Sequence, residues 1–196
     1  MSALLLLAPL RIEAHAARKG APGADVMVTG MGPDRSRAAA AAAASRPASA
    51  VAVLGFCGAL DDSLRPGDVV VAEELRVNEG HPILCRQSDS VAAALAEAGV
   101  RARRGPLLSV PKAVRGAKRA ELASVGSLAV DMESAWLAEA AAGRPFAALG
   151  AVVDTPSHEL VRFSTLSGGI KAYRALRSAA SALEHWADSL PTQKET

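Results

Sequence analysis

Aromatic side chains are scarce in this chain: phenylalanine, tryptophan and tyrosine together make up 3% of its 196 residues. Few rings are therefore available as stacking platforms, which argues against binding of single-stranded nucleic acid. Hydrophobic residues nevertheless amount to 50%, so alanine, valine and leucine must build the core.

Cysteine is rare as well, since Cys57 and Cys85 are the only two in the sequence. They form no CxxC motif, which excludes the cysteine spacing of a zinc site or a disulfide framework. No two of the four histidines are spaced as metal ligands usually are. We therefore expect a reduced, cytoplasmic protein that holds no metal.

Strong charge and long apolar runs are also lacking. The net charge is +2, too small a bias to indicate nucleic-acid binding by itself. No run reaches the roughly 20 apolar residues of a transmembrane helix. The apolar residues 4–10 resemble the core of a signal peptide, but Pro9 interrupts them and no Lys or Arg precedes them. A first buried strand is the preferred interpretation.

Short apolar runs alternate with helical patterns along the chain. The runs are nearly continuous in Val, Leu and Ala, which is typical of strands covered on both faces. Strands are predicted over residues 3–8, 25–29, 50–55, 68–73, 105–109, 126–130 and 145–153, and helices over 12–18, 34–44, 88–98, 117–124, 132–142 and 168–189. This alternation predicts an α/β fold, a three-layer α/β/α sandwich with a central mixed sheet. We expect one domain over residues 1–190 and a flexible tail over 191–196.

Two glycine-containing segments follow predicted strands. Residues 29–33, TGMGP, lack the third glycine of a dinucleotide fingerprint, so a tight turn is the preferred interpretation. In residues 55–60, GFCGAL, the glycines indicate backbone shaped around a ligand. Phe56 fits base stacking and core packing equally well, and Cys57 has no local basic partner that would make it a nucleophile.

Carboxylates gather where predicted strands end. Glu133 lies in the segment VDMESA, residues 130–135, and Asp154 ends the run that begins at residue 145. Ligands of α/β sheets bind outside the carboxyl ends of the strands, and the two oxygens of a glutamate can accept from a ribose diol. Helix capping is the alternative for Asp131, a turn acid for Asp154, and a solvated helix start for Glu13.

Basic residues form a loose group, for which a solvated face is the first interpretation and attraction to an anionic membrane surface the second. Its members are Arg101, Arg103, Arg104, Arg115, Lys118 and Arg119.

Taken together, the segments GFCGAL at 55–60, LRPGDVV at 64–70 and VDMES at 130–134, followed by Asp154 at a strand end, resemble the purine nucleoside phosphorylase and methylthioadenosine nucleosidase superfamily. The order and spacing match over nearly the whole chain. Within the superfamily, VDMES and GALDDSLRPGD are most similar to the hopanoid-associated nucleoside phosphorylases, which are linked to removal of adenine from adenosylhopane. A nucleoside phosphorylase-like fold is therefore expected.

The resemblance implies roles for particular residues. Asp154 matches the acid that protonates the purine at N7, and Glu13 matches the residue that positions the attacking water. Met132 and Glu133 match the pair that packs under the ribose and holds its hydroxyls. The loop at the ribose side corresponds to Gly55, Phe56, Cys57 and Gly58, and Val114 falls at the base pocket.

The sequence also departs from the family pattern. Gly150 stands where many members carry an arginine four residues before the acid. Phosphorylases place a Ser or Thr hydroxyl and an Arg on phosphate, where this chain has Phe56 and Val53. Water is therefore favoured as the nucleophile, with no cofactor and with phosphate as an alternative co-substrate. Arg11 is the candidate left for an anion contact.

The predicted activity is cleavage of the N-glycosidic bond of an adenosine derivative, with adenosylhopane as the first candidate. One alternative is a methylthioadenosine, adenosylhomocysteine or futalosine nucleosidase, and another is a catalytically weak nucleoside- or lipid-binding protein. The expected partners are a small-molecule adenosine derivative, which can be lipid-linked, a peripheral membrane contact and further copies of the chain, but no nucleic acid.

Overall fold

The computed structural model of the protein describes residues 2–155 and 166–191. Its elements follow in the order β1 (Leu4–Ala8), α1 (Arg11–Gly20), β2 (Asp25–Val28), α2 (Pro33–Ala44), β3 (Ala50–Ala59), β4 (Val69–Arg76), β5 (Ile83–Leu84), α3 (Ser88–Glu97), β6 (Ala102–Ser109), α4 (Gly116–Ala123), β7 (Ala129–Asp131), α5 (Ser134–Leu137), the 3₁₀ helix η1 (Ala138–Ala141), β8 (Phe146–Asp154) and α6 (Leu166–Ser189). Strands and helices alternate through most of the chain, as the apolar runs predicted.

The strands form one mixed sheet that partly closes on itself. β1 lies between β2 and β3 and is parallel to both. β3 pairs with β8 in parallel and with β7 in antiparallel. β8 also pairs with β4, β4 pairs with β6, and β6 pairs with β7. The circuit β3–β8–β4–β6–β7, which we call the strand ring, therefore returns to its starting strand.

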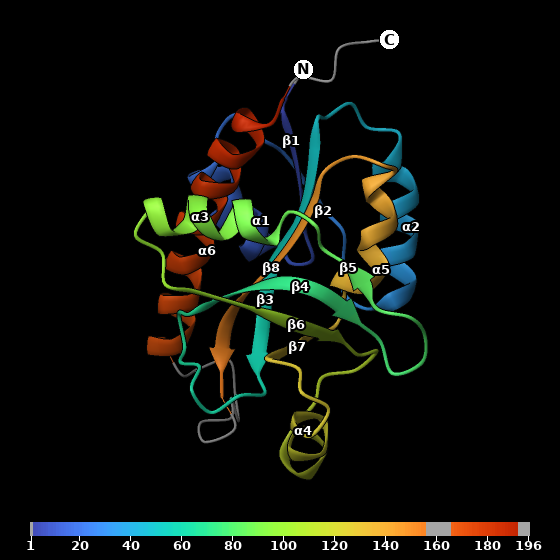
Figure 1. Ribbon diagram of the computed structural model, residues 1–196, viewed down its shortest axis with the longest axis vertical. Coiled ribbons are helices and arrows are strands. Elements are labelled where there is room, and N and C mark those ends of the chain that lie inside the picture. Colours follow the sequence, from blue (N-terminus) through green and yellow to red (C-terminus); the bar gives the residue numbers. More distant parts are fainter. Residues whose placement is uncertain (1, 156–165, 192–196) are drawn as a thin grey trace.

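Helices cover both faces of the sheet (Figure 1). On one face, α1, α3 and α6 pack on Leu4, Leu6 and Leu54 in a cluster that also buries Trp186. On the other, the alanine-rich α2 packs closely on Leu5 and Leu7. Alternate residues of β1 thus point into different layers, and the prediction of a three-layer α/β/α sandwich with a mixed sheet is confirmed. α4 stands apart and packs on a smaller cluster through Leu122.

The predicted boundaries differ from the observed ones mainly near the glycines. β3 does not end at Gly55 but continues to Ala59, so the segment GFCGAL begins inside a strand rather than after one. α5 begins at Ser134 instead of residue 132, and only four residues of it are α-helical before η1. The two-residue strand β5 was not predicted because Ile83 and Leu84 are too few to show a pattern. The predicted tail lies, except for residue 191, outside the described residues.

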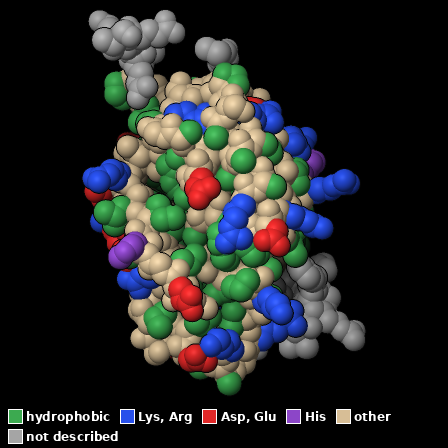
Figure 2. Space-filling model, turned by 90° about the vertical axis from the view of Figure 1, so that its right-hand side faces the viewer, with side chains coloured by type: hydrophobic (Ala, Val, Ile, Leu, Met, Phe, Trp, Pro, Cys, Tyr) green, Lys and Arg blue, Asp and Glu red, His purple; other side chains and the backbone are tan. Residues whose placement is uncertain are grey.

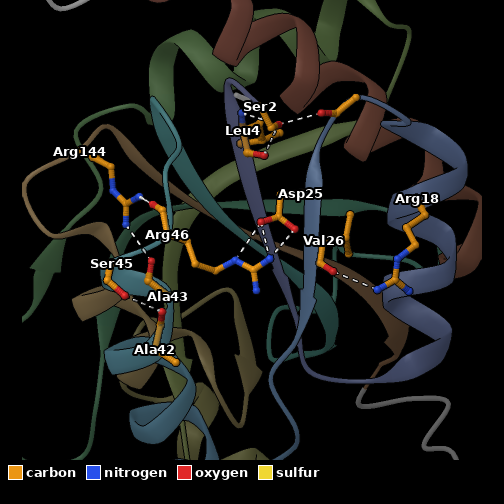
Figure 3. A network of polar contacts seen from close by, with 11 residues as sticks. Ser2, Leu4, Arg18, Asp25, Val26, Ala42, Ala43, Ser45, Arg46 and Arg144 are labelled. Atoms are coloured by element: carbon orange, nitrogen blue, oxygen red, sulfur yellow. Dashed lines mark hydrogen bonds and ion pairs between the residues drawn. The ribbon is translucent and has the colours of Figure 1, made fainter.

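Polar contacts secure the sheet edge away from these glycines (Figure 3). Asp25 on β2 accepts two hydrogen bonds of 2.9 Å from the guanidinium of Arg46, which follows α2. Arg144 donates to the carbonyl oxygen of Arg46 at 2.6 Å. β2, the end of α2 and the segment before β8 are therefore held together by one network.

Charged side chains of both signs are interspersed with apolar ones on the side of the molecule shown in Figure 2, in keeping with the net charge of +2. Among the helices of the described residues, none combines the length and the apolar character needed to cross a membrane. The N-terminal apolar run forms the buried strand β1, which confirms the preferred interpretation of that segment.

Candidate active site

A cavity of about 340 Å³ opens at the carboxyl ends of β1, β7 and β8, beside the last part of β3. This is the size of a small-molecule site, at the edge of the sheet where α/β proteins bind ligands. Most of the predicted site residues line it: Glu13, Phe56, Cys57, Gly58, Val114, Met132, Glu133 and Asp154. Side chains from the whole length of the chain therefore converge here.

Glu13 sits in the first turn of α1 with 2% of its surface exposed. One carboxylate oxygen accepts from the backbone N–H of Leu10 at 2.6 Å, which caps the helix, and the other accepts from the N–H of Phe56 at 2.7 Å. Burial raises the pKa of Glu13 to about 8, against the two backbone hydrogen bonds and with help from nearby Glu133 and Asp131. Glu13 is therefore not a solvated helix-start residue but a buried carboxyl group at the cavity wall.

Asp131 and Glu133 follow the end of β7. Asp131 is buried, accepts from the Ser109 hydroxyl at 2.5 Å and from the backbone N–H of Ser134 at 3.2 Å, and so holds the start of α5. Burial raises the pKa of Asp131 above its ordinary value. Asp131 therefore accepts hydrogen bonds at the start of α5, as the capping alternative predicted, and it also lines the cavity beside Glu133.

Glu133 reaches across to the turn before α2, where one carboxylate oxygen accepts from the backbone N–H of Gly32 at 2.9 Å. Gly32 and Gly30 adopt positive φ angles of 87° and 82°, which explains the glycines of the TGMGP segment as turn residues. Burial raises the pKa of Glu133 to about 7, opposed by the hydrogen bond from Gly32. This turn also brings Met31 to the cavity wall.

Asp154 ends β8 and pairs with a buried arginine from α4. Arg119 Nη2 lies 2.6 Å from Asp154 Oδ1, and Arg119 Nε donates to the carbonyl oxygen of Ala59 at 2.9 Å. Only 2% of Arg119 is exposed, and it too lines the cavity. The expectation that Arg119 belongs to a solvated basic face is therefore wrong.

Gly58 on β3 makes room for this ion pair. A Cβ atom at position 58 would lie 2.8 Å from Asp154 Oδ1 and would overlap Arg119 Nη2. Gly55 plays a similar part for Glu13, since a Cβ there would lie 3.3 Å from Glu13 Oε1. Gly55 does not itself line the cavity; it lets the carboxylate approach the strand.

Gly150, where the family pattern has an arginine, faces the Cys57 side chain, whose Sγ would lie 2.6 Å from a Cβ at position 150. No larger side chain fits there while Cys57 keeps its place. The guanidinium beside Asp154 comes from α4 instead. Burial, with Asp131 and Asp154 nearby, raises the pKa of the Cys57 thiol well above its ordinary value, which disfavours a thiolate nucleophile.

Arg11 is not brought to the cavity wall and is exposed at the start of α1, so an anion contact through it stays a prediction. Sequence reasoning missed Arg119, Met31 and Ile12 as lining residues. Arg119 precedes the buried Leu122 by three positions, so it shares the inward face of its helix, and that spacing is the signal which could have identified it. In the described part of the chain, no group of three or more His, Cys, Asp or Glu residues is arranged to hold a metal ion.

Comparisons with known proteins agree on the architecture. The chain superimposes on 5′-methylthioadenosine/S-adenosylhomocysteine nucleosidase from Helicobacter pylori, solved with butyl-thio-DADMe-Immucillin-A, with a TM-score of 0.79 and 18% identity over 97% of this chain and 99% of that one. Futalosine hydrolase of Helicobacter pylori gives 0.78 and 18% over 95% and 97%. The Campylobacter jejuni nucleosidase gives 0.81 and 14% over 97% and 100%.

No curated protein matches the chain in sequence. The family model described as the phosphorylase superfamily matches residues 20–181, most of the chain. The protein therefore belongs to the phosphorylase superfamily, which confirms the prediction of an enzyme of the nucleosidase or nucleoside phosphorylase type.

Proposed function

We propose that the protein cleaves the N-glycosidic bond of an adenosine derivative, with Asp154 as the acid and Glu13 as the base. The observation that carries the proposal is that both carboxyl groups line one cavity along the same strand. Glu13 contacts β3 at the Phe56 N–H, and Asp154 lies against Gly58. Two residues of strand span roughly 7 Å, of the order of the 6.5–9.5 Å by which inverting glycosidases separate an acid from a base to admit a water.

The reaction follows from these positions. As the C1′–N9 bond breaks, its electron pair leaves with the purine, and Asp154, assigned as the general acid, delivers a proton to N7. The oxygen of a water bonds to C1′, and the proton that it releases goes to Glu13 in its ionised form, whose share increases as pH rises through the raised pKa of about 8. General acid and base groups of this kind contribute about 10²–10⁴-fold each.

Arg119 supports the general acid by stabilising the Asp154 carboxylate that forms when the proton is transferred. After the transfer Asp154 is a carboxylate, and a guanidinium 2.6 Å away favours that form. The stabilisation grows as the proton leaves, so it acts on the transition state more than on the bound substrate.

Glu133 and Met132 are assigned to the sugar. Both line the cavity. One oxygen of Glu133 accepts from the Gly32 N–H at 2.9 Å and the other from the Met132 N–H at 3.2 Å. These two bonds orient the carboxylate, and its remaining lone pairs are assigned to the ribose hydroxyls. Phe56 and Val114 supply apolar wall on the same cavity.

Water is favoured over phosphate as the nucleophile. Two arginines line the cavity in the described part of the chain, Arg115 and Arg119. The charge of Arg119 is already paired with Asp154, so Arg115 is the one left to bind a phosphate. Val53, where phosphorylases carry an arginine, is buried in the apolar layer under α2. Phosphate as co-substrate is the alternative that the assay below decides.

We assign an apolar group to the 5′ position of the substrate. Adenosylhopane is the first candidate substrate, which would give the protein a role in hopanoid biosynthesis. Ile12 and Met31 both line the cavity while 53% and 46% of their surfaces are exposed, so they form an apolar rim. A lipid-linked nucleoside would fit such a rim, as would contact with a membrane surface or with a second copy of the chain in a homo-oligomer. A short 5′-methylthio group also fits, which keeps a methylthioadenosine or futalosine nucleosidase as the second candidate.

The test is release of adenine from adenosylhopane and from methylthioadenosine, with and without phosphate, by the wild type and by Asp154→Asn. Phosphate-independent release that the variant loses is the expected result, and the preferred substrate identifies the 5′ group. Strict dependence on phosphate would overturn the assignment of water. Binding of both nucleosides with no base release would favour the catalytically weak binding protein.

A further inference from the structure

Exposed apolar side chains gather around the mouth of the cavity. Ile12 and Met31 form its apolar rim, and Ile170, of which 46% is exposed, follows Gly169, which also lines the cavity. These side chains come from α1, from the turn before α2 and from α6, so the cluster exists only in the folded chain. Exposed apolar surface that is gathered in one place marks a site of contact.

Exposed basic side chains stand beside these apolar ones. Arg11 precedes Ile12 at the start of α1. Arg35 packs on the turn that carries Met31, since a Cβ at Gly30 would lie 2.8 Å from Arg35 Cδ. With two residues of the loop before α4 they form what we call the basic group of the mouth: Arg11, Arg35, Lys112 and Arg115.

The charges of the basic group are not neutralised within the described part of the chain. Lys112 and Arg115 flank residues 113–114, which line the cavity. No member of the group forms an ion pair with another described residue. Asp34, the exposed acid that follows the Met31 turn, is already paired with Arg37 at 3.4 Å. The positive charge at the mouth is therefore available to an anionic partner.

The acids of the cavity lie deeper than the basic group. Only 2% of Glu13, 7% of Glu133 and 9% of Asp131 is exposed, and Asp154 is paired with Arg119. The mouth thus presents apolar side chains and unpaired positive charge to the outside. This combination suits the surface of a membrane with anionic headgroups, where apolar side chains enter the headgroup boundary and basic ones lie at the phosphates.

We propose that the mouth of the cavity docks on the surface of a membrane that contains anionic lipids. The inference rests on the proposed cleavage of a nucleoside with an apolar 5′ group, and it identifies the membrane surface as the place from which such a substrate is drawn. A second copy fits this face less well. Two copies joined by the same face about a two-fold axis would bring their basic groups together, and like charges across an interface are unfavourable.

The experiment measures co-sedimentation of the protein with vesicles of phosphatidylcholine alone and with vesicles that also contain phosphatidylserine. The wild type should bind the second kind more tightly and should be released at high salt, because salt screens the attraction to the headgroups. Three variants are compared with it: Arg35→Gln/Lys112→Gln, Ile170→Ser and the control Lys19→Gln/Arg177→Gln.

The control pair removes the same charge at a different place. Lys19 lies in the last turn of α1, and Arg177 lies against Gly20 at the end of that helix, whereas Ile12 is in its first turn. Neither pair, nor Ile170, lines the cavity. Cleavage of methylthioadenosine in the absence of vesicles should therefore be the same in all three variants as in the wild type.

Arg35→Gln/Lys112→Gln should weaken binding to the anionic vesicles about 25-fold, at about fivefold for each basic residue near the surface. Ile170→Ser should weaken it about fivefold, because roughly half of this side chain is left to be buried. The control pair should bind almost as the wild type does, since its charges lie farther from the membrane and are screened.

Three results would overturn the inference. One is equal binding of the wild type to both kinds of vesicle. Another is equal weakening by the two charge pairs, because attraction would then come from charge alone without a defined face. The third is a dimer in analytical ultracentrifugation that Ile170→Ser dissociates while vesicle binding is retained, which would assign the face to a second copy.

Vesicle binding is measured without a nucleoside, so its outcome is independent of the proposed function. If no nucleoside is cleaved but the variants bind vesicles in the expected order, the docking face stands and the glycosidic activity has failed. If nucleosides are cleaved and anionic vesicles are not bound, the activity stands and the docking face is refuted.

Discussion

Replacement of Glu13 by glutamine should change how stability depends on pH. Glu13 is buried, and its pKa is raised from 4.5 to about 8. Between these values the native protein holds a proton that the unfolded chain has released, so the free energy of unfolding falls as pH rises through this window. At about 1.4 kcal/mol per pH unit, the loss amounts to about 5 kcal/mol above pH 8.

Glu13→Gln removes the titrating carboxyl group and also lowers the stability of the native state through a lost hydrogen bond. The amide has one acceptor oxygen for two backbone donors, Leu10 N–H and Phe56 N–H, so one of them meets an NH₂ group. This costs about 1–3 kcal/mol and does not depend on pH. The variant should therefore be less stable than the wild type near pH 5, should gain on it as pH rises to about 8, and the difference should level off above that pH.

Urea unfolding at intervals between pH 5 and pH 9 measures the difference. The remaining carboxyl groups are common to both proteins, so the difference between the two curves isolates Glu13. Glu121→Gln is the matched control, because 65% of the Glu121 side chain is exposed; its curve should stay parallel to that of the wild type. If the Glu13→Gln curve also ran parallel to the wild type across this range, the raised pKa of Glu13 would be refuted.

Further predictions concern the acid and its surroundings. Asp154→Asn should lower kcat for base release about 10²–10⁴-fold while calorimetry still detects nucleoside binding; loss of binding without loss of kcat would contradict the assignment. Gly58→Ala should displace the Arg119–Asp154 pair, for which a Cβ leaves no room, and lower stability by about 1–3 kcal/mol in urea unfolding. Gly150→Ala should destabilise by a similar amount, because the new Cβ would meet the Cys57 side chain. The double variant Gly150→Ala/Cys57→Ala should recover part of this loss. If the stability changes of the two single variants simply added up in the double variant, that contact would be ruled out.

The fold was predictable because its signals are local. Buried parallel strands are continuous runs of Val, Leu and Ala, and each of these runs became a strand at nearly the expected position. The exception is instructive: glycines usually mark strand ends, yet Gly55 and Gly58 lie within β3. Their lack of a side chain serves the approach of Glu13 and of the Arg119–Asp154 pair, which is a tertiary requirement that no local pattern displays.

The candidate site was predictable only in part, for the same reason. Carboxylates at strand ends pointed to Glu13, Glu133 and Asp154, all of which line the cavity. Arg119 could not be paired with Asp154 from the sequence, because its contacts are with Ala59 and Asp154, both distant along the chain. Arginine is ordinarily exposed to solvent, so its residue type predicted a surface position for Arg119 rather than a buried one.

Closure of the strand ring links ligand capture to the completion of folding. Gly58 of β3 pairs directly with Val130 of β7, and β8, β4 and β6 complete the circuit between these two strands. Contacts between such distant parts of a chain form late because of their loop entropy. Gly58, Glu133 and Asp154 lie on or directly after strands of the ring, so a partly assembled chain has no partial cavity to offer. A nucleoside that binds the cavity should therefore stabilise the whole domain at once, and its effect should appear as a single upward shift of Tm rather than as protection of one segment.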